Sequence, residues 1–294
     1  MRAQYYLWFA IIAPFFLGLL WPASGLFLKP YVMPMLMAMM FFSCLKINIA
    51  DFKTLPKNLW RFAIILAMIF LLPVLGVWLF RNFMDHLVFA GLILAASMPA
   101  GIAVVFLSDV LGGEPAKAMV STALAHILAP VVSPFLVWFF VRKTVDINLV
   151  GMMVLIAKLV LIPFVAAQAL KLLRLHGKFI LVSKFTNNLL LFLIVLGIIA
   201  PARSLILNAG SQLNIAVAVV AAVVVTQVFL AILFGRTHKE DVTWSVVSTF
   251  KNFTLSSVIA MSAFGPSALL GSVAYIIVDN LALIPISIFS KFKK

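Results

Sequence analysis

Residues 94–109 read LAASMPAGIAVVFLSD, an apolar stretch interrupted in its middle by Pro99-Ala100-Gly101. Proline removes a backbone donor and glycine tolerates unusual dihedral angles, so a helix is expected to break here, or at least to kink. A break inside a membrane exposes backbone groups and is tolerated only within protein or beside a cavity. The second half of a broken helix would offer free N–H groups to an anion. The stretch therefore predicts either a break within a membrane helix that could bind an anion, or a simple kink.

The composition around this stretch is that of a membrane protein. Of 294 residues, 65% are hydrophobic and 10% are charged, against roughly 25% charged residues in a soluble domain. The mean hydropathy is +1.21. Such a chain can cover its surface only if lipid is its solvent. The single cysteine, Cys44, excludes an intramolecular disulfide and a cysteine-based metal cluster. The sequence predicts an all-α integral membrane protein whose partner is the lipid bilayer.

Ten membrane spans are predicted, since each span needs about 20 apolar residues. The first apolar run is longer than the core of a cleaved signal peptide and is interpreted as a span. Charged or turn-forming residues separate the spans, except at 264–266, where the break is short and uncharged. The spans are placed near 5–21, 29–47, 60–80, 86–108, 115–141, 147–170, 179–200, 212–235, 241–263 and 267–290.

The net charge of +14 is explained by topology rather than by nucleic-acid binding, because the charges lie in short loops between apolar runs. Five basic residues fall on one side of the predicted membrane: Lys29, Arg81, Arg142, Lys143 and Arg203. Fifteen fall on the side of the termini: Arg2, Lys46, Lys53, Lys57, Arg61, Lys117, Lys171, Arg174, Lys178, Lys184, Arg236, Lys239, Lys291, Lys293 and Lys294. This asymmetry predicts cytoplasmic termini, in a prokaryotic inner or plasma membrane.

The two halves of the chain, 1–143 and 144–294, resemble each other. WSVVSTFKNFTLSS at 244–257 is, like 94–109, an apolar segment with helix-disfavouring residues in its middle. HILAPVVSPF at 126–135 and DNLALIPISIF at 279–289 share their composition and the placement of proline. Two repeats of five spans must be inverted, and inverted repeats with interrupted helices are typical of secondary transporters.

Lys251 is the sharpest candidate for a functional residue. It lies in the middle of the ninth predicted span, flanked by Thr249, Asn252 and Thr254. A charge at that depth costs roughly 3 kcal/mol on insertion scales, so a functional role is the default expectation. It could be a counter-charge for an anionic substrate, take the place of a bound cation, or couple transport to protons. A lysine that snorkels to the interface is the alternative.

Two further titratable residues lie inside predicted spans. His126 shares a helix face with Thr122 and could be either a hydrogen-bonded core histidine or part of the transport path. Asp279 occupies the position that matches His126 in the second half. As a buried carboxylate it is interpreted as a partner of Lys251 or an ion ligand.

Enzyme motifs are missing from the sequence, which has no DDxxD pair, HExxH, GxSG with a suitable histidine, or Walker loop. The sequence therefore predicts a secondary transporter of a small organic anion, not an enzyme, with no cofactor. A membrane-embedded enzyme, a channel, and a proton- or cation-coupled antiporter that uses Lys251 and Asp279 are the competing interpretations.

Four stretches in order resemble the bile acid:sodium symporter family: MAMMFFSCLKINIADF (37–52), AASMPAGIAVV (95–105), STALAHILAPVVSPF (121–135) and FKNFTLSS (250–257). The resemblance implies ten helices as two inverted five-helix repeats, with helices 4 and 9 broken and crossing in a core domain. It implies a panel domain of helices 1, 2, 6 and 7, alternating access, and organic anion substrates such as bile acids or small carboxylates. Asn252 matches the family's crossover asparagine. Arsenite-exporter relatives fit less well, because Cys44 lies in helix 2 rather than helix 4.

Several positions depart from the family's sodium ligands. Val104 and Val105 stand where the family has Ser-Asn, and Val247 stands where it has Glu. Three further departures follow the same pattern: Lys251 replaces a Gln, Met68 a second Gln, and His126 a hydroxyl, although Thr122 is kept. Because valine offers no side-chain oxygen, two ordinary sodium sites cannot be rebuilt. The hypothesis is a sodium-independent member in which the Lys251 ammonium occupies the cation position. Transport would then be uniport, exchange, or coupled to protons through Lys251.

Overall fold

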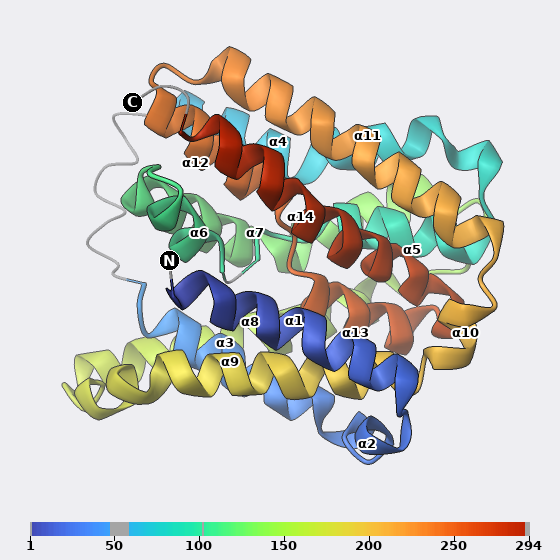
Figure 1. Cartoon of the computed structure of the whole chain (residues 1–294), viewed down its shortest axis with the longest axis horizontal. Helices are drawn as coiled ribbons and strands as arrows, with labels where there is room; N and C mark the ends of the chain where they lie inside the picture. Colours follow the sequence, from blue (N-terminus) through green and yellow to red (C-terminus); the bar gives the residue numbers. More distant parts are fainter. Residues whose placement is uncertain (1, 48–58, 102, 292–294) are drawn as a thin grey trace.

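A computed structural model describes residues 2–47, 59–101 and 103–291, and every regular element within these ranges is helical (Figure 1). The longer helices are α1 (Arg2–Leu20), α3 (Val32–Cys44), α4 (Leu59–Leu79), α7 (Pro115–Val141), α8 (Leu149–Leu172), α9 (Gly177–Ile199), α11 (Ser211–Phe234) and α14 (Leu269–Phe289). The shorter elements are α2 (Ala23–Leu26), η1 (Lys29–Tyr31), η3 (Arg81–Phe83), α5 (His86–Ala96), α6 (Val104–Val110), α10 (Arg203–Leu207), α12 (His238–Thr249), α13 (Phe253–Ala263) and η4 (Pro266–Ala268). The end of the 37–52 stretch and the predicted cytoplasmic residues Lys53, Lys57, Lys293 and Lys294 lie outside the described residues.

Within the described residues, six helical segments are long and apolar enough to cross a membrane, and α9 is a seventh if its two bent halves form one span. They are Ala23–Cys44, Leu59–Leu79, Pro115–Val141, Leu149–Leu172, Ser211–Phe234 and Pro266–Phe289. The chain is therefore a multi-pass membrane protein. The two predicted spans at 86–108 and 241–263 are each divided into two shorter helices, α5 with α6 and α12 with α13. At the uncharged boundary the chain turns at Gly265, whose φ of 83° suits glycine.

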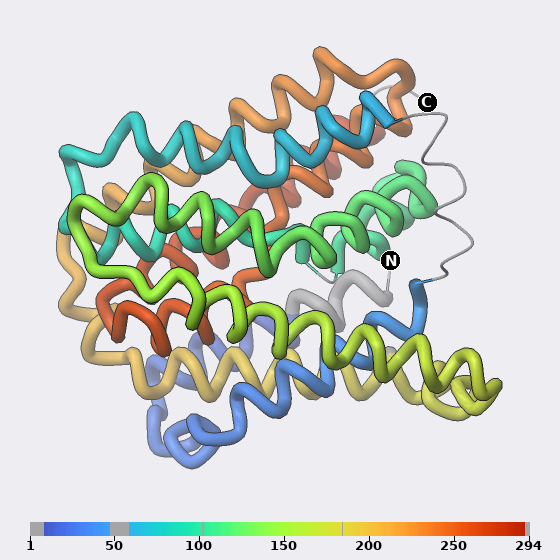
Figure 2. Tube along the Cα trace, turned by 180° about the vertical axis from the view of Figure 1, so that it is seen from behind, coloured from blue at the N-terminus to red at the C-terminus, as the bar shows by residue number. Residues whose placement is uncertain are grey.

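The helices form two groups that lie side by side. Helices α1, α3, α8 and α9 contact one another on one side of the molecule, and α4, α5, α7, α11, α12 and α14 contact one another on the other (Figures 1 and 2). Helix α13 contacts both groups, and α7 joins the second group to α8. The second half of one broken helix, α13, therefore lies where the two groups meet.

Helices α5 and α14 touch backbone to backbone. A Cβ atom built on Gly91 of α5 would overlap the carbonyl group of Ala268, and one built on Gly271 of α14 would overlap the main chain of Gly91. Small residues allow membrane helices to approach this closely, which maximises van der Waals contact where no hydrophobic force acts between helices. The two glycines thus set the distance between α5 and α14.

A buried ion pair joins the start of α4 to the start of α12. Arg61 lies 2.6 Å from Glu240, with side-chain exposures of 8% and 5%, and its guanidinium stacks on Trp244. Lys117 of α7 reaches the same carboxylate at 3.1 Å, but its own side chain is 44% exposed. Because buried charges must be paired whereas exposed pairs contribute little, Arg61 is the structural partner of Glu240.

We expect Arg61→Met to lower the stability of the fold by about 2 kcal/mol, because Lys117 only partly replaces the lost charge next to Glu240. Lys117→Met is the matched control and should cost less than about 1 kcal/mol, since its ammonium is solvated. Thermal unfolding of both variants in detergent measures the difference. Equal losses would mean that burial does not distinguish the two pairs.

Candidate functional site

The two broken helices cross through their extended segments. Ala100 and Lys251 form an antiparallel bridge. The amide of Gly101 donates to the carbonyl of Phe250 at 2.8 Å, and the amide of Asn252 donates to the carbonyl of Pro99 at 2.9 Å. These bonds satisfy backbone groups that the helix breaks leave free inside the membrane domain.

Gly101 is required by this close crossing. A Cβ atom at this position would lie 3.0 Å from the carbonyl oxygen of Lys251, closer than ordinary van der Waals contact. The sequence therefore singled out Gly101 correctly as part of a break. What the sequence did not reveal is which distant segment comes close to it.

Lys251 lies between α12 and α13 rather than within a helix, and it is 2% exposed. Its ammonium donates a hydrogen bond to the carbonyl of Ile69 on α4. That carbonyl lacks its usual helical partner, because Pro73 stands four residues later and has no N–H. The proline in α4 therefore creates the acceptor that receives the buried ammonium.

Gln227 of α11 completes the polar contacts beside Lys251. Its side-chain nitrogen donates to the carbonyl of Met68 at 3.0 Å and to the carbonyl of Ser248 at 2.7 Å. Three carbonyl oxygens from α4 and α12 thus receive hydrogen bonds from two side chains of the protein itself. Sequence reasoning missed Gln227, although it is an amide within an otherwise apolar stretch of α11.

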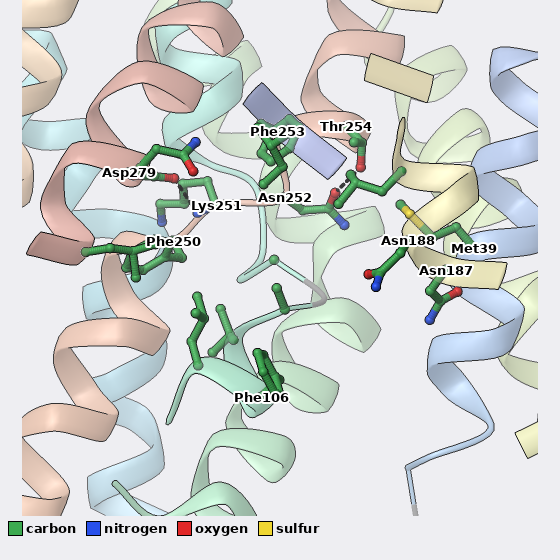
Figure 3. A pocket seen from close by; sticks show the side chains of 18 of the residues that line it. Met39, Phe106, Asn187, Asn188, Phe250, Lys251, Asn252, Phe253, Thr254 and Asp279 are labelled. Atoms are coloured by element: carbon green, nitrogen blue, oxygen red, sulfur yellow. Dashed lines mark hydrogen bonds between the residues drawn. The ribbon is translucent and has the colours of Figure 1, made fainter. Parts of the chain in front are cut away.

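Asp279 of α14 contacts Lys251 through the backbone. Its Oδ2 atom accepts a hydrogen bond from the Lys251 amide at 3.1 Å (Figure 3), while Oδ1 has no hydrogen-bond partner. The side chain is buried, with 3% exposure. The ammonium of Lys251 forms no ion pair with this carboxylate within 4.0 Å. The predicted partnership of Lys251 and Asp279 is therefore a main-chain contact and not a salt bridge.

Asn252 caps α13 and also contacts His126. Its Oδ1 atom accepts from the Leu255 amide at 3.1 Å and from the Thr254 hydroxyl at 2.8 Å, the arrangement of a helix N-cap. Its amide nitrogen therefore faces Nε2 of His126, at 3.4 Å. Nδ1 of His126 lies 2.8 Å from the Thr122 carbonyl. Because a carbonyl can only accept, the histidine donates from Nδ1 and presents Nε2 as an acceptor to Asn252.

A cavity of about 270 Å³ opens at the crossing. Of the predicted site residues, Gly101, Lys251, Asn252, Thr254 and Asp279 line it. The other four predicted site residues lie outside its lining: Pro99 and His126 bond to Asn252, the Thr249 hydroxyl bonds back to Ser245 in its own helix, and the Thr122 hydroxyl is buried without a partner.

Further polar residues line the cavity from the neighbouring helices. Asn187 and Asn188 of α9 face Asp279 and Lys251 across the space (Figure 3). Lys46, which follows α3, and Asn280 of α14 also line it. The sequence predicts for Lys46 only a place among the basic residues on the cytoplasmic side. Asn280 directly follows the predicted site residue Asp279. The cavity is therefore lined by four asparagines, two lysines and one acid among the described residues.

A helical membrane domain with two broken helices crossing beside a cavity, lined here by polar and by apolar side chains, is the architecture of a membrane transport protein. Residues 33–214 match the model of the sodium bile acid symporter family. The chain belongs to that family, as the four sequence stretches predicted. It is similar to an uncharacterized sodium-dependent transporter, YocS, of Bacillus subtilis (strain 168), with 26% identity over 158 residues. The match covers 53% of this chain and 49% of that protein, about half of its length.

Proposed function

We propose that the protein is a secondary transporter of a small organic anion and works by alternating access without bound sodium. The observation that carries this proposal is the position of Lys251. Its ammonium donates a hydrogen bond to the Ile69 carbonyl on α4, which Pro73 leaves without a helical partner. A fixed positive charge there pre-organises the crossing in the way that a bound cation would in a sodium-coupled carrier.

The lining of the cavity favours an anion. Three of the four asparagines already use a side-chain N–H within the protein: Asn187 donates to the Ser43 hydroxyl, Asn280 to the Ile276 carbonyl, and Asn252 to His126. The donors to an anion would therefore be Asn188 and the second N–H of Asn187 and of Asn280, and Lys46 adds a positive charge from the other group of helices. The N-terminus of α13, which begins at Phe253 beside the cavity, adds a favourable dipole. The volume lies just below the range of about 300–1,000 Å³ that is usual for ligand sites. Among the substrates that the family resemblance implies, small carboxylates therefore fit better than bile acids.

Sodium independence rests on the residues that replace the family's ligands. Val104, Val105 and Val247 offer only backbone oxygens, and the Ser248 carbonyl already accepts from Gln227. Sodium is a hard cation and needs several oxygen ligands. The Bacillus subtilis relative is described as sodium-dependent. Lys251 and Gln227 are the features by which this chain would differ from a sodium-dependent carrier.

We further propose ten spans arranged as two inverted five-helix repeats, 1–143 and 144–294. The two divided helices, which come from matching positions in the two halves, support this arrangement. The separation of α1, α3, α8 and α9 from the remaining helices supports a panel and a core domain that move relative to each other. The 15 to 5 distribution of basic residues supports cytoplasmic termini.

A proton- or cation-coupled antiporter is the second candidate function. The observation that favours it is Asp279, a carboxylate in the cavity with one oxygen lacking a partner. An antiporter would bind a cation or an amine at this carboxylate in place of an anion beside the asparagines.

Thermal shift in detergent tests the proposal, with pyruvate, succinate and cholate as probes in matched sodium and choline buffers. We expect a small carboxylate to stabilise the wild type equally in both buffers and Lys251→Gln to lose this response. Lys158→Gln is the matched control, because Lys158 also lies within a span, on α8, but is exposed and does not line the cavity. Stabilisation that requires sodium would show that a cation site exists and that Lys251 does not replace it.

A further inference from the structure

We infer that Asp279 carries a proton together with the organic anion, so that the cavity accepts the anion only when this carboxyl group is protonated. This inference rests on the proposed function and adds the coupling ion to it. It depends on the position of Asp279 within the cavity, on its unpartnered oxygen, and on the groups that surround it.

Asp279 faces the space that the anion would occupy. It is the one acid among the described residues that line the cavity. One of its oxygens accepts from the Lys251 amide, and the other is buried without a hydrogen-bond partner. A buried polar atom without a partner needs a proton, a water or a ligand to satisfy it. The free oxygen is therefore the place in this cavity where a proton can be held.

Lys251 does not neutralise this carboxylate by direct contact. Its ammonium is directed to the Ile69 carbonyl on α4, and its main-chain amide is the part that touches Asp279. The ammonium of Lys251 thus joins α4 to the crossing through this hydrogen bond. An anion that entered the cavity would meet the Asp279 charge with no cation paired to it.

The elements packed around α14 supply few other titratable groups. Helices α11 and α13 and the turn η4 contain none, and α5 contains only His86 at its first residue. Those of α12, from His238 to Asp241, lie in its first turn, at the opposite end of that helix from the crossing. On α14 itself, Tyr275 lies one turn before Asp279, and its buried hydroxyl has no partner. Lys46, which follows α3, lines the same cavity as Asp279. Lys251, Tyr275 and Lys46 are therefore the groups that can influence it.

Like charges inside a low-dielectric site repel strongly, so an ionised Asp279 and a bound carboxylate disfavour each other. A proton taken from the aqueous side onto the free oxygen removes this repulsion. It also converts the oxygen into a donor for the anion. The anion and the proton then bind together and leave together on the other side, and no bond other than the carboxyl O–H forms or breaks. By linkage, the proton strengthens anion binding to the extent that the anion strengthens proton binding.

Calorimetric titration of the detergent-solubilised protein with pyruvate and with succinate tests this inference. Where Asp279 is ionised in the free protein, we expect the dissociation constant to rise about tenfold per pH unit, the slope for uptake of one proton. Titration in phosphate and in Tris, which differ in ionisation enthalpy, should show one proton taken up for each anion bound. This second readout uses the wild type alone and does not depend on a folded variant.

Asp279→Asn should bind pyruvate, whose own carboxyl group stays ionised across the tested pH range, with an affinity that no longer changes with pH. Asp109→Asn is the control, because Asp109 is an exposed acid at the end of α6 outside the cavity, and it should retain the wild-type slope. Binding without proton uptake, or a slope that persists in Asp279→Asn, would overturn the inference and leave the anion transporter standing. Failure of both probes to bind at any pH from about 5 to about 8, across which carboxyl groups shifted by burial titrate, would count against the proposed function instead.

Discussion

Replacing Lys251 with methionine should destabilise the protein by about 3 kcal/mol. Methionine fills a similar volume, so the loss reflects the missing ammonium and not a cavity. The Ile69 carbonyl becomes a buried acceptor without a partner, whereas the main-chain contact with Asp279 is retained. An unsatisfied buried acceptor costs about 1–3 kcal/mol, and the loss of a hydrogen bond from a charged donor lies at the upper end of that range. Thermal unfolding in detergent measures the effect.

A second substitution distinguishes the cause. Pro73→Ala returns an N–H to the position four residues after Ile69, where a straight helix would bond the Ile69 carbonyl. The double variant Lys251→Met with Pro73→Ala should therefore recover at least 1 kcal/mol, about the value of one buried hydrogen bond. Lys158→Met is the control and should change little, because Lys158 is exposed on α8. If the double variant is no more stable than Lys251→Met alone, the lost hydrogen bond to Ile69 is not the source of the destabilisation.

Alanine at Gly91 or Gly271 is expected to reduce the stability by about 3 kcal/mol or more. Each new methyl group would overlap the main chain of the facing helix and not a movable side chain. Overpacking that cannot be relieved by a rotamer change forces the two helix backbones apart. The yield of folded protein and its unfolding temperature in detergent are the measurements.

Gly177→Ala provides the comparison for these two variants. Gly177 is also helical, at the first residue of α9, and a Cβ built there meets no atom within 4 Å. Alanine is the better helix former by about 1 kcal/mol, so this variant should be as stable as the wild type or more stable. Similar losses of stability at all three positions would show that the close α5–α14 contact is not the cause of the destabilisation.

Local signals in the sequence predicted the broken helices well. Proline and glycine at 99–101, and the polar run around Lys251, interrupt apolar stretches in a way that needs no knowledge of distant residues. The family resemblance was also visible, because four short stretches occur in order. These features depend on residue type and on short spacing, which a single sequence displays directly.

The contacts of the site could not be predicted in the same way. Lys251 and its acceptor Ile69 lie 182 residues apart along the chain. The Ile69 carbonyl is available only because Pro73 interrupts the same helix. The bond between His126 and Asn252 joins residues 126 positions apart. Such pairs arise from how two helix groups pack, and apolar membrane helices resemble one another too closely for their packing partners to be deduced from composition. Gln227 was missed for this reason, because its role is visible only once α4 and α12 lie beside α11.

The bridge between Ala100 and Lys251 has a consequence for how such a protein can diverge. The two segments hold each other by amide and carbonyl groups, which every residue except proline supplies in full. Apart from Gly101, where a Cβ would crowd the facing carbonyl, side chains at the crossing can therefore be exchanged over evolutionary time while the backbone scaffold persists. The side chain at 251 can be changed without removing the backbone bonds of the crossing. Substrate range and energy source can then change by a few substitutions, without passing through an unfolded ancestor.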